Sequence, residues 1–579
     1  MIKSEYPNPQ FERETWMNLN GEWDFYSDYS NDGTDRNLQE KDAEFPERIT
    51  VPFCRESRLS GIGETGFCCC VWYRKKVELP ENWQGKRILL HIGGCDYETT
   101  VWVNGKRVGL HRGGFVSFTF DITENLESGG ENTITVRAYD DIRSWKQPSG
   151  KQSVRLKSYS CSYTRVTGIW ETVWLEAVEK SYLQSAKYYP DIENRAVAVQ
   201  VNAENAEGMT VEAVASYEGR EMGRATAVVH LRSAMLYLPL SELHLWEVGN
   251  GRLYDLKLTM GGDTVNSYFG MRSVGIRDGI VQINGKPIFQ KLVLDQGYYP
   301  DGIWTAPDEK ALVADIEVSL AMGFNGARLH QRVFSQRYLY HCDRLGYLVW
   351  EEYGNWFVRL DCAEGWRSVL PEWSEIVERD FNSPALIGWC PLNETGNDID
   401  EELVRYLATV TRSIDRTRLY IETSGFKHFP ELADLLDSHD YSQDPEEIRK
   451  KYEPLLRGED AIVYTPTWRW HTKDSLYGKV SFISECGGAS FAVGDSQGGA
   501  WGYGDAPKTK EEFLERFRGI LGAMMENPKI GGFCYTQLYD IEQEINGLLT
   551  YGREPKFDLD EIRTILSQPA AAELCNCGD

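Results

Sequence analysis

The sequence predicts a multidomain protein with two β-sandwiches followed by a (β/α)8 TIM barrel. A chain of 579 residues is too long for one hydrophobic core. Up to about residue 277, short alternating apolar runs are separated by turn residues, which is typical of all-β domains. Beyond that point, apolar runs alternate with amphipathic segments. We therefore expect domains at 1–180, 181–277 and 278–579.

The first expected domain is an all-β sandwich. Asn104-Gly105 separates two short alternating segments and is a strong signal for a type I′ hairpin. The clearest strand candidates are Val71–Leu79, Arg87–Ile92, Thr99–Val103 and Thr133–Tyr139.

The second expected domain contains strands without helical spacing. Val197, Val199 and Val201 alternate with other residues, as do Leu256 and Leu258 around Lys257. About 95 residues of this kind predict an immunoglobulin-like β-sandwich.

The third expected domain is built from repeated strand–helix units. Amphipathic segments such as Glu309–Met322, Ser335–Leu345 and Glu511–Met525 separate the strands. Eight such units in about 300 residues are the size of a TIM barrel. The eight strand candidates are Pro287–Leu294, Phe324–Leu329, Tyr347–Glu352, Ala385–Glu394, Leu419–Gly425, Leu435–Tyr441, Val480–Gly487 and Ile530–Leu538.

Composition excludes several classes of partner. The net charge of −26 argues against nucleic acid, which requires a basic surface. No apolar run is long enough to cross a membrane, and the first ten residues do not resemble a secretory signal, so we expect a cytoplasmic protein. Thirteen cysteines without paired metal-ligand spacing fit a reducing compartment and predict no metal site.

Two carboxylates end apolar strands of the expected barrel. Glu394 follows the fourth strand and Glu485 lies in the seventh. Active sites of TIM barrels lie at the carboxyl ends of the strands. One strand-end glutamate is most often a structural ion-pair partner, but two on different strands fit glycosidic bond cleavage. That reaction needs one carboxyl group as acid and another as nucleophile or base.

The sequence also resembles glycoside hydrolase family 2, the family of β-galactosidases, β-glucuronidases and β-mannosidases. The motifs that carry the resemblance are Asn20-Gly21-Glu22-Trp23, Val101–Gly109, Gly113-Gly114-Phe115, Phe120–Thr123, Gly168-Ile169-Trp170, Asn393-Glu394 and Ser484-Glu485. The resemblance implies that the first sandwich is a sugar-binding-type jelly roll. It also implies a retaining double displacement, with Glu485 as the nucleophile and Glu394 as the general acid/base.

The resemblance implies further substrate-binding candidates. Asn393 could bind the sugar hydroxyl beside the anomeric carbon, and Arg328 and Glu352 would orient the nucleophile, although a plain ion pair explains them equally well. Tyr441 would donate to the nucleophile or else pack at the rim. The remaining candidates are Asp440 beside Tyr441, Arg165 in a loop that reaches the sugar from the first domain, and His330, which is otherwise a core histidine.

Departures from the family pattern leave the sugar open. Asp295 stands where a sugar-binding histidine is usual. The stretch Ile545–Leu549 lacks the lysine with which β-glucuronidases bind the uronate, so Arg165 or Arg328 would have to bind it.

We therefore expect an exo-acting, β-galactosidase-like enzyme for a carbohydrate substrate, with no cofactor or metal and as a possible homo-oligomer. The alternatives are β-glucuronidase, α-L-arabinofuranosidase or β-galactofuranosidase activity, and a non-catalytic carbohydrate-binding protein.

Overall fold

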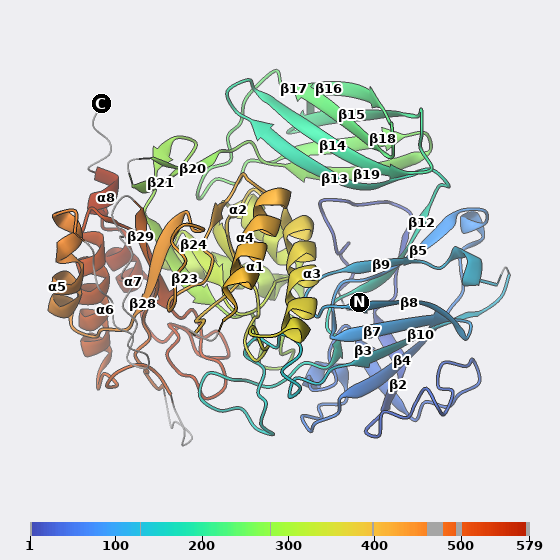
Figure 1. The fold of residues 1–579 in the computed structure, drawn as a ribbon, viewed down its shortest axis with the longest axis horizontal. Helices are drawn as coiled ribbons and strands as arrows, with labels where there is room; N and C mark the ends of the chain where they lie inside the picture. Colours follow the sequence, from blue (N-terminus) through green and yellow to red (C-terminus); the bar gives the residue numbers. More distant parts are fainter. Residues whose placement is uncertain are drawn as a thin grey trace.

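The computed structural model describes residues 3–127, 129–277, 279–396, 399–459, 479–493 and 501–574. Two β-sandwiches lie beside a parallel barrel, so that all three expected domain types are present (Figure 1). The amino-terminal sandwich and the second sandwich contact different sides of the barrel (Figure 1). None of the helices in the described ranges combines the length and apolar character required to cross a bilayer.

The first sandwich packs a six-stranded sheet, in the order β3-β2-β4-β10-β7-β8, against a four-stranded sheet, in the order β1-β12-β5-β9. Asn104 and Gly105 both have positive φ, at 53° and 77°, which confirms the hairpin between β7 and β8. A short pair, β6 and β11, completes the domain. The strands are β1 Trp16–Asn18, β2 Gly21–Ser27, β3 Glu47–Val51, β4 Cys70–Val77, β5 Arg87–Ile92, β6 Cys95–Asp96, β7 Glu98–Val103, β8 Lys106–Arg112, β9 Phe118–Asp121, β10 Asn132–Tyr139, β11 Gly168–Ile169 and β12 Val173–Val178.

The second sandwich packs the sheet β13-β14-β17 against the sheet β16-β15-β18-β19. Val197, Val199 and Val201 are buried in its core while their neighbours Ala198 and Gln200 are half-buried, as the alternation predicts. Its strands are β13 Tyr182–Asp191, β14 Ala196–Glu204, β15 Thr210–Tyr217, β16 Arg220–Val228, β17 Ser233–Pro239, β18 Tyr254–Met260 and β19 Asp263–Phe269. A small sheet leads into the barrel through β20 Val274–Arg277, β21 Ile280–Ile283 and β22 Lys286–Pro287.

The barrel contains eight strands in the order β27-β26-β25-β24-β23-β30-β29-β28, and the pairs that join them are parallel. β27 and β28 are the two end strands of this sheet, and they do not pair with each other. The barrel is therefore nearly, but not fully, closed. The strands are β23 Gln290–Asp295, β24 Gly326–Leu329, β25 Leu348–Glu352, β26 Leu386–Cys390, β27 Leu419–Tyr420, β28 Leu435–Asp440, β29 Val480–Gly487 and β30 Ile530–Thr536.

The helices surround this barrel in the regular alternation, except in the fifth unit. Residues 421–434 connect β27 to β28 without a helix. β27 ends at Tyr420, so it is shorter than the expected strand Leu419–Gly425. The amphipathic segments predicted from the sequence form α1, α2 and α6. The helices are α1 Glu309–Met322, α2 Gln336–Leu345, α3 Ala363–Asp380, α4 Glu401–Ile414, α5 Pro445–Leu456, α6 Lys510–Met525, α7 Leu559–Leu566 and α8 Ala571–Leu574.

Candidate active site

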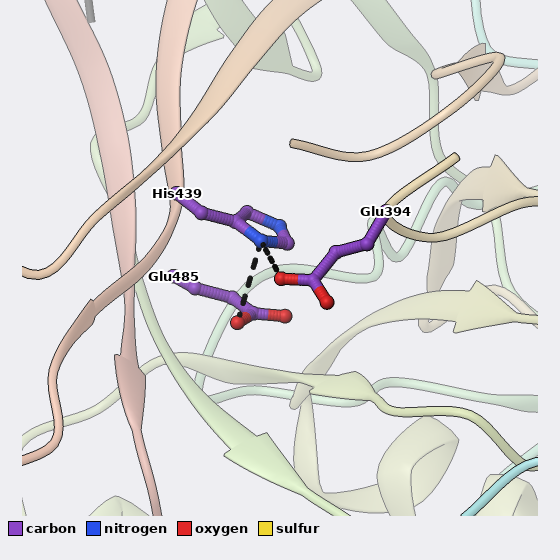
Figure 2. A group of neighbouring side chains, drawn as sticks. All are labelled: Glu394, His439 and Glu485. Atoms are coloured by element: carbon purple, nitrogen blue, oxygen red, sulfur yellow. Dashed lines mark hydrogen bonds and ion pairs between the residues drawn. The ribbon is translucent and has the colours of Figure 1, made fainter. Parts of the chain in front are cut away.

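Glu394 and Glu485 meet at the carboxyl ends of the barrel strands (Figure 2). Glu394 follows β26, and Glu485 belongs to β29. One carboxylate oxygen of each residue and a ring nitrogen of His439 all lie within 4.8 Å of one another. Two carboxyl groups about 5 Å apart are typical of retaining glycosidases, whereas inverting enzymes keep roughly 6.5–9.5 Å between theirs.

Glu485 is buried among hydrogen-bond donors. Its Oε1 accepts a hydrogen bond from Nη1 of Arg328 at 2.8 Å, and its Oε2 accepts one from the hydroxyl of Tyr441. Burial alone would raise the pKa of this carboxyl group, but the positive charges of His439 and Arg328 lower it well below its ordinary value. Glu485 is therefore ionised at neutral pH, as a nucleophile must be.

Glu394 has a more open environment. Its backbone adopts a left-handed conformation with φ of 51°, and its N–H donates to the carbonyl of Ser424 at 2.8 Å. The side chain is 19% exposed and contacts Nδ1 of His439 at 2.8 Å. A partly exposed carboxyl group can exchange protons with a leaving group and with water, which a general acid/base requires.

His439 lies between the two carboxylates and was not among the residues predicted from the sequence. Its Nδ1 is 2.8 Å from Glu394 and 3.5 Å from Glu485, and its Nε2 is 3.1 Å from the hydroxyl of Ser424. Burial opposes protonation of the ring, but the two carboxylates raise its pKa above the ordinary value. Gly425 makes room for the ring, since a Cβ there would lie 2.6 Å from the imidazole.

The alternation of β28 separates the two residues predicted at its end. Tyr441 shares the inward face with His439 and reaches Glu485. Asp440 faces away and binds Nζ of Lys451 at 3.0 Å and the backbone and side chain of Ser442. The prediction that Asp440 binds substrate is therefore corrected, because this carboxylate contacts α5 rather than the site.

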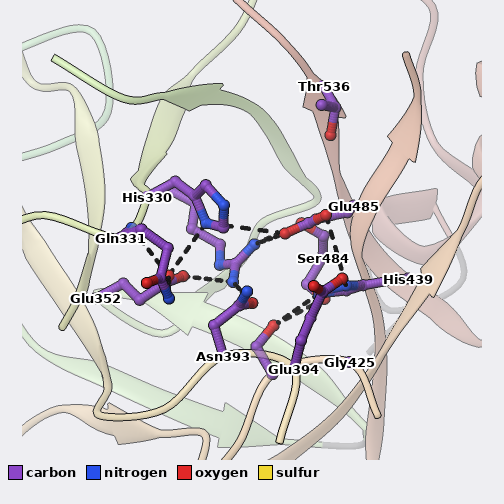
Figure 3. Close-up of polar contacts among 12 residues, drawn as sticks. His330, Gln331, Glu352, Asn393, Glu394, Gly425, His439, Ser484, Glu485 and Thr536 are labelled. Carbon is purple, nitrogen blue, oxygen red and sulfur yellow. Dashed lines mark hydrogen bonds and ion pairs between the residues drawn. The ribbon is translucent and has the colours of Figure 1, made fainter. Parts of the chain in front are cut away.

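An ion-pair network holds Glu485 (Figure 3). Nη2 of Arg328 donates to Oδ1 of Asn393 at 2.6 Å and also contacts the carboxylate of Glu352. Glu352 in turn accepts from the backbone and side chain of Gln331, at 2.9 and 3.0 Å. Arg328 thus contacts both Glu485 and Glu352, and Nδ2 of Asn393 is buried without a hydrogen-bond partner among the described residues.

His330 also belongs to this cluster. Its Nδ1 lies 3.1 Å from Oε1 of Glu352 but is not aligned for a hydrogen bond, and it is 3.8 Å from Glu485. Burial and the charge of Lys151 lower its pKa well below the ordinary value. The ring is therefore neutral and offers hydrogen bonds rather than a charge.

The structure does not bring Asp295 into the cluster. Its carboxylate oxygens accept hydrogen bonds from the hydroxyls of Tyr338 and Tyr539 and from the N–H of Gly297. These contacts join β23 to α2 and to the loop after β30. The expected replacement of a sugar-binding histidine by Asp295 is thus corrected: the carboxylate is engaged within the scaffold.

Arg165 is likewise outside the cluster. Its guanidinium donates to the carbonyls of Ser153, Arg155 and Thr65, and it lies 4.2 Å from the ring centroid of Phe67. All of these partners belong to the first sandwich and its loops. Arg165 is therefore a structural residue, and the expectation that it reaches the sugar is corrected.

A second polar group lies in and around the loop after β30 and was also missed by the sequence analysis. Glu544, in the loop after β30, accepts hydrogen bonds from the hydroxyl of Tyr163 and from Nδ2 of Asn546. Gln537 donates to Asn546 at 2.8 Å and accepts from Gln296 at 2.5 Å. Loop residues of this kind carry no periodic signal, which is why the sequence did not single them out.

The spacing of Glu394, His439 and Glu485 would also fit a metal ion. The guanidinium of Arg328 lies against Glu485 and the ring of His439 contacts both acids. A cation at that position would be repelled by Arg328. The donor set therefore fits an acid/base pair better than a metal centre.

Comparisons with known proteins agree with this geometry. Residues 62–169 match the family model described as "Glycosyl hydrolase 2 galactose-binding domain-like", residues 181–272 match "Glycosyl hydrolases family 2", and residues 274–460 match "Glycosyl hydrolases family 2, TIM barrel domain". Together these three regions cover more than half of the chain.

Curated relatives and solved structures extend the comparison. The chain is 25% identical over 445 residues to a β-galactosidase of Thermoanaerobacter pseudethanolicus, covering 74% of this chain and 57% of that protein. It is 25% identical over 439 residues to the β-glucuronidase of Rattus norvegicus, covering 69% of this chain and 67% of that protein. The β-glucuronidase from Ruminococcus gnavus, solved in complex with D-glucuronic acid, has the same fold, with a TM-score of 0.80 at 18% identity over 98% of this chain and 100% of that one.

The relatives thus share the fold, while the chain spans little more than half of the first of them. Three consecutive matches in the family's own domain order show that the chain belongs to glycoside hydrolase family 2.

Proposed function

We propose that this protein is a retaining glycosidase that removes terminal sugars from small glycosides or oligosaccharides. The single observation that carries the proposal is the approach of the Glu394 and Glu485 carboxylates to within 4.8 Å. This separation leaves room for an anomeric carbon between them, but not for the additional water of an inverting mechanism.

The reaction would proceed in two steps. Glu394 protonates the glycosidic oxygen while Glu485 attacks the anomeric carbon, which releases the aglycone alcohol and forms a glycosyl ester on Glu485. Glu394, now a carboxylate, removes a proton from water as that water attacks the anomeric carbon. The ester bond breaks, Glu485 leaves as a carboxylate, and Glu394 is protonated again. Two inversions at one carbon retain its configuration.

The surrounding side chains prepare each group for its step. Arg328 and Tyr441 bind opposite oxygens of Glu485 and hold it ionised and oriented. His439 contacts both acids, so its protonation can respond when Glu394 loses or regains its proton. The free Nδ2 of Asn393 is placed to bind a hydroxyl that strengthens its contact in the transition state.

For the sugar, we propose a neutral, galactose-like glycone. A hexuronide requires a cation for its carboxylate, and both arginines considered for that purpose are committed elsewhere. Arg328 pairs with Glu485 and Glu352, while Arg165 donates to backbone carbonyls. β-Glucuronidase activity remains the second candidate, because relatives from several sources carry that name.

We also propose that the enzyme works in a reducing compartment such as the cytoplasm. The eleven cysteines within the described ranges are free thiols, and most of them are buried. Buried thiols without disulfide partners are typical of reducing environments.

A substrate panel with product stereochemistry tests the proposed function. We would assay nitrophenyl β-galactoside, β-glucuronide, β-mannoside, α-L-arabinofuranoside and β-galactofuranoside, and follow the anomer released by NMR. The proposal expects turnover of the β-galactoside with the β-anomer released first. A 2-fluoro-glycoside should label Glu485, which peptide mapping can locate. Release of the α-anomer from the β-galactoside would exclude a double displacement, and sugar binding without turnover of any substrate would indicate a non-catalytic binding protein.

A further inference from the structure

Lys151 lies at the mouth of the barrel although it belongs to the first sandwich. It is part of the loop between β10 and β11. The backbone of this loop is hydrogen-bonded to the loop after β25. The N–H of Ser149 donates to the carbonyl of Trp356 at 3.0 Å, and the N–H of Gly150 donates to that of Gly354 at 2.9 Å. A Cβ on Gly150 would lie 2.3 Å from the carbonyl oxygen of Gln331. Gln331 is labelled in Figure 3, so this contact joins the loop of Lys151 to the cluster shown there.

The same loop is fixed to its own domain on both sides of Lys151. Gln152 donates to Oδ2 of Asp96 at 2.8 Å and accepts from the N–H of Val166 at 2.8 Å. Gln147 donates to Oδ1 of Asp140 at 2.7 Å. Buried hydrogen bonds of this kind hold a side chain at a defined position before any ligand binds.

The ammonium group of Lys151 has no protein acceptor among the described residues. The residue is 7% exposed, and Nζ lies 5.0 Å from the ring centroid of Trp356. No hydrogen bond or ion pair of Nζ is formed within the described ranges. By contrast, Nζ of Lys556, which is also buried, contacts Asp540 and the carbonyls of Phe491 and Ile545. Nζ is thus a charged donor without an acceptor among the described residues, which leaves it free to bind an acceptor on a ligand.

The carboxylates that act on Lys151 are those of the site. Burial lowers the pKa of Lys151, but Cys161 and then Glu544, Glu485 and Glu394 raise it overall, so the group stays charged. Lys151 in turn lowers the pKa of His330. Tyr163 joins Lys151 to Glu544 geometrically, because its N–H donates to the carbonyl of Lys151 at 2.8 Å and its hydroxyl donates to the carboxylate of Glu544.

We propose that Lys151 is a substrate-binding residue of the first sandwich, which together with Glu544 holds a hydroxyl group of a neutral glycone. This inference rests on the proposed function. A hydroxyl group can accept from Nζ of Lys151 and donate to a carboxylate at the same time. The carboxylate of a uronate cannot donate a hydrogen bond. At Lys151 that carboxylate would also lie among the negative charges of Glu544 and Glu485.

The test compares K151M with K157M, a matched substitution in the same loop at an exposed lysine. On nitrophenyl β-galactoside, K151M should lower kcat/KM about 10- to 100-fold, the range for a hydrogen bond to a charged group. K157M should stay within twofold of the wild type. Thermal unfolding should verify that K151M keeps the fold. A kcat/KM equal to that of the wild type would overturn the proposal.

Deoxygenated substrates identify the hydroxyl. Among the 3-, 4- and 6-deoxygalactosides, one should be hydrolysed equally by the wild type and by K151M, because the contact is already absent. An equal further loss on all three would overturn the inference. E544Q should lower turnover of the galactoside. The ratio of β-glucuronide turnover to galactoside turnover should rise in this variant. A loss by K151M confined to the glucuronide would instead make Lys151 the uronate-binding cation and contradict the proposal.

Failure of the proposed function is distinguishable from failure of this inference. The panel on the wild type decides the first, and K151M against K157M decides the second. If the wild type hydrolyses no glycoside, calorimetric binding of galactose by the wild type and both variants still tests Lys151. Binding of galactose that is unchanged in K151M would then overturn the inference.

Discussion

The two glutamates of the site are the same residue type in two different environments. The side chain of Glu485 is 4% exposed and is bound by Arg328, Tyr441 and His439. The side chain of Glu394 is 19% exposed, and its contact within the described part of the site is to His439. Glu485 is thus held by a network, whereas Glu394 is held by its backbone and one ring.

This difference shows how one barrel separates the tasks of two carboxyl groups. A nucleophile must be ionised and fixed before the substrate arrives, and neighbouring positive charges achieve both. A general acid/base must gain and lose a proton in each cycle, so a dense set of donors to its carboxylate would hinder it. The following variants are ordered by the size of the effect that this view predicts.

The largest effect is expected for removal of the nucleophile. E485A should lower kcat on every substrate by about 10⁵-fold, because no glycosyl ester can form and the remaining site gives only binding and acid catalysis. Steady-state assays with a dinitrophenyl glycoside measure the loss, and circular dichroism verifies the fold. A loss smaller than tenfold would exclude Glu485 as the nucleophile.

Removal of the acid/base should give an effect that depends on the leaving group. E394A should lower kcat/KM about 10³-fold for a methyl or alkyl glycoside, the usual size of general acid–base catalysis. Formation of the ester from a dinitrophenyl glycoside needs no proton and should be nearly unaffected. Added azide should then accelerate turnover and give the β-glycosyl azide, which mass spectrometry detects. Equal losses for all leaving groups, with no response to azide, would contradict the assignment.

Loss of Arg328 should make the environment of Glu485 more like that of Glu394. The pH profile of kcat/KM should show this change. The charge of Arg328 contributes to the low pKa of Glu485. In R328M that pKa should rise, so the fraction of ionised nucleophile should decline at a higher pH than in the wild type. The acidic limb of kcat/KM should therefore move to higher pH, with a loss of about 100-fold at neutral pH for a hydrogen-bonded charge pair.

R328K is the matched control for this shift. It keeps the charge near Glu485 but cannot also bind Asn393 in the same geometry. Its acidic limb should stay close to that of the wild type while kcat falls. A limb that does not move in R328M would show that Arg328 has no part in the ionisation of Glu485.

Much of this arrangement was predictable from residue patterns. The barrel strands follow from apolar runs, and Glu394 and Glu485 follow from their positions where those runs end. Arg328 and Glu352, at the ends of the second and third strand candidates, were singled out through the family resemblance. A strand end is a local feature of the chain, so the sequence contains the information needed to find it.

The residues that were missed depend on contacts between distant segments. His439 is next to Asp440, and only the alternation of β28 in register with β29 decides which of them faces the site. Lys151 and Glu544 lie in loops of two different domains, and nothing periodic links them. The fifth unit lacks its helix, and residues 421–434 form irregular backbone between β27 and β28 instead.

The smallest effect is expected at Tyr441, which binds the oxygen of Glu485 opposite Arg328. Y441F removes one hydroxyl and keeps the ring that stacks on Tyr503, with 3.4 Å between centroids. A hydrogen bond to a charged group contributes about 1.5–3 kcal/mol, so kcat should fall roughly 10- to 100-fold. Pre-steady-state kinetics would locate the loss in formation or breakdown of the ester. Y503F, which keeps both rings and leaves the bond to Glu485, is the control and should remain close to wild-type activity. If Y441F matched Y503F, the nucleophile would be oriented by Arg328 and His439 alone, and the contrast between the two glutamates would rest on charge rather than on hydrogen bonding.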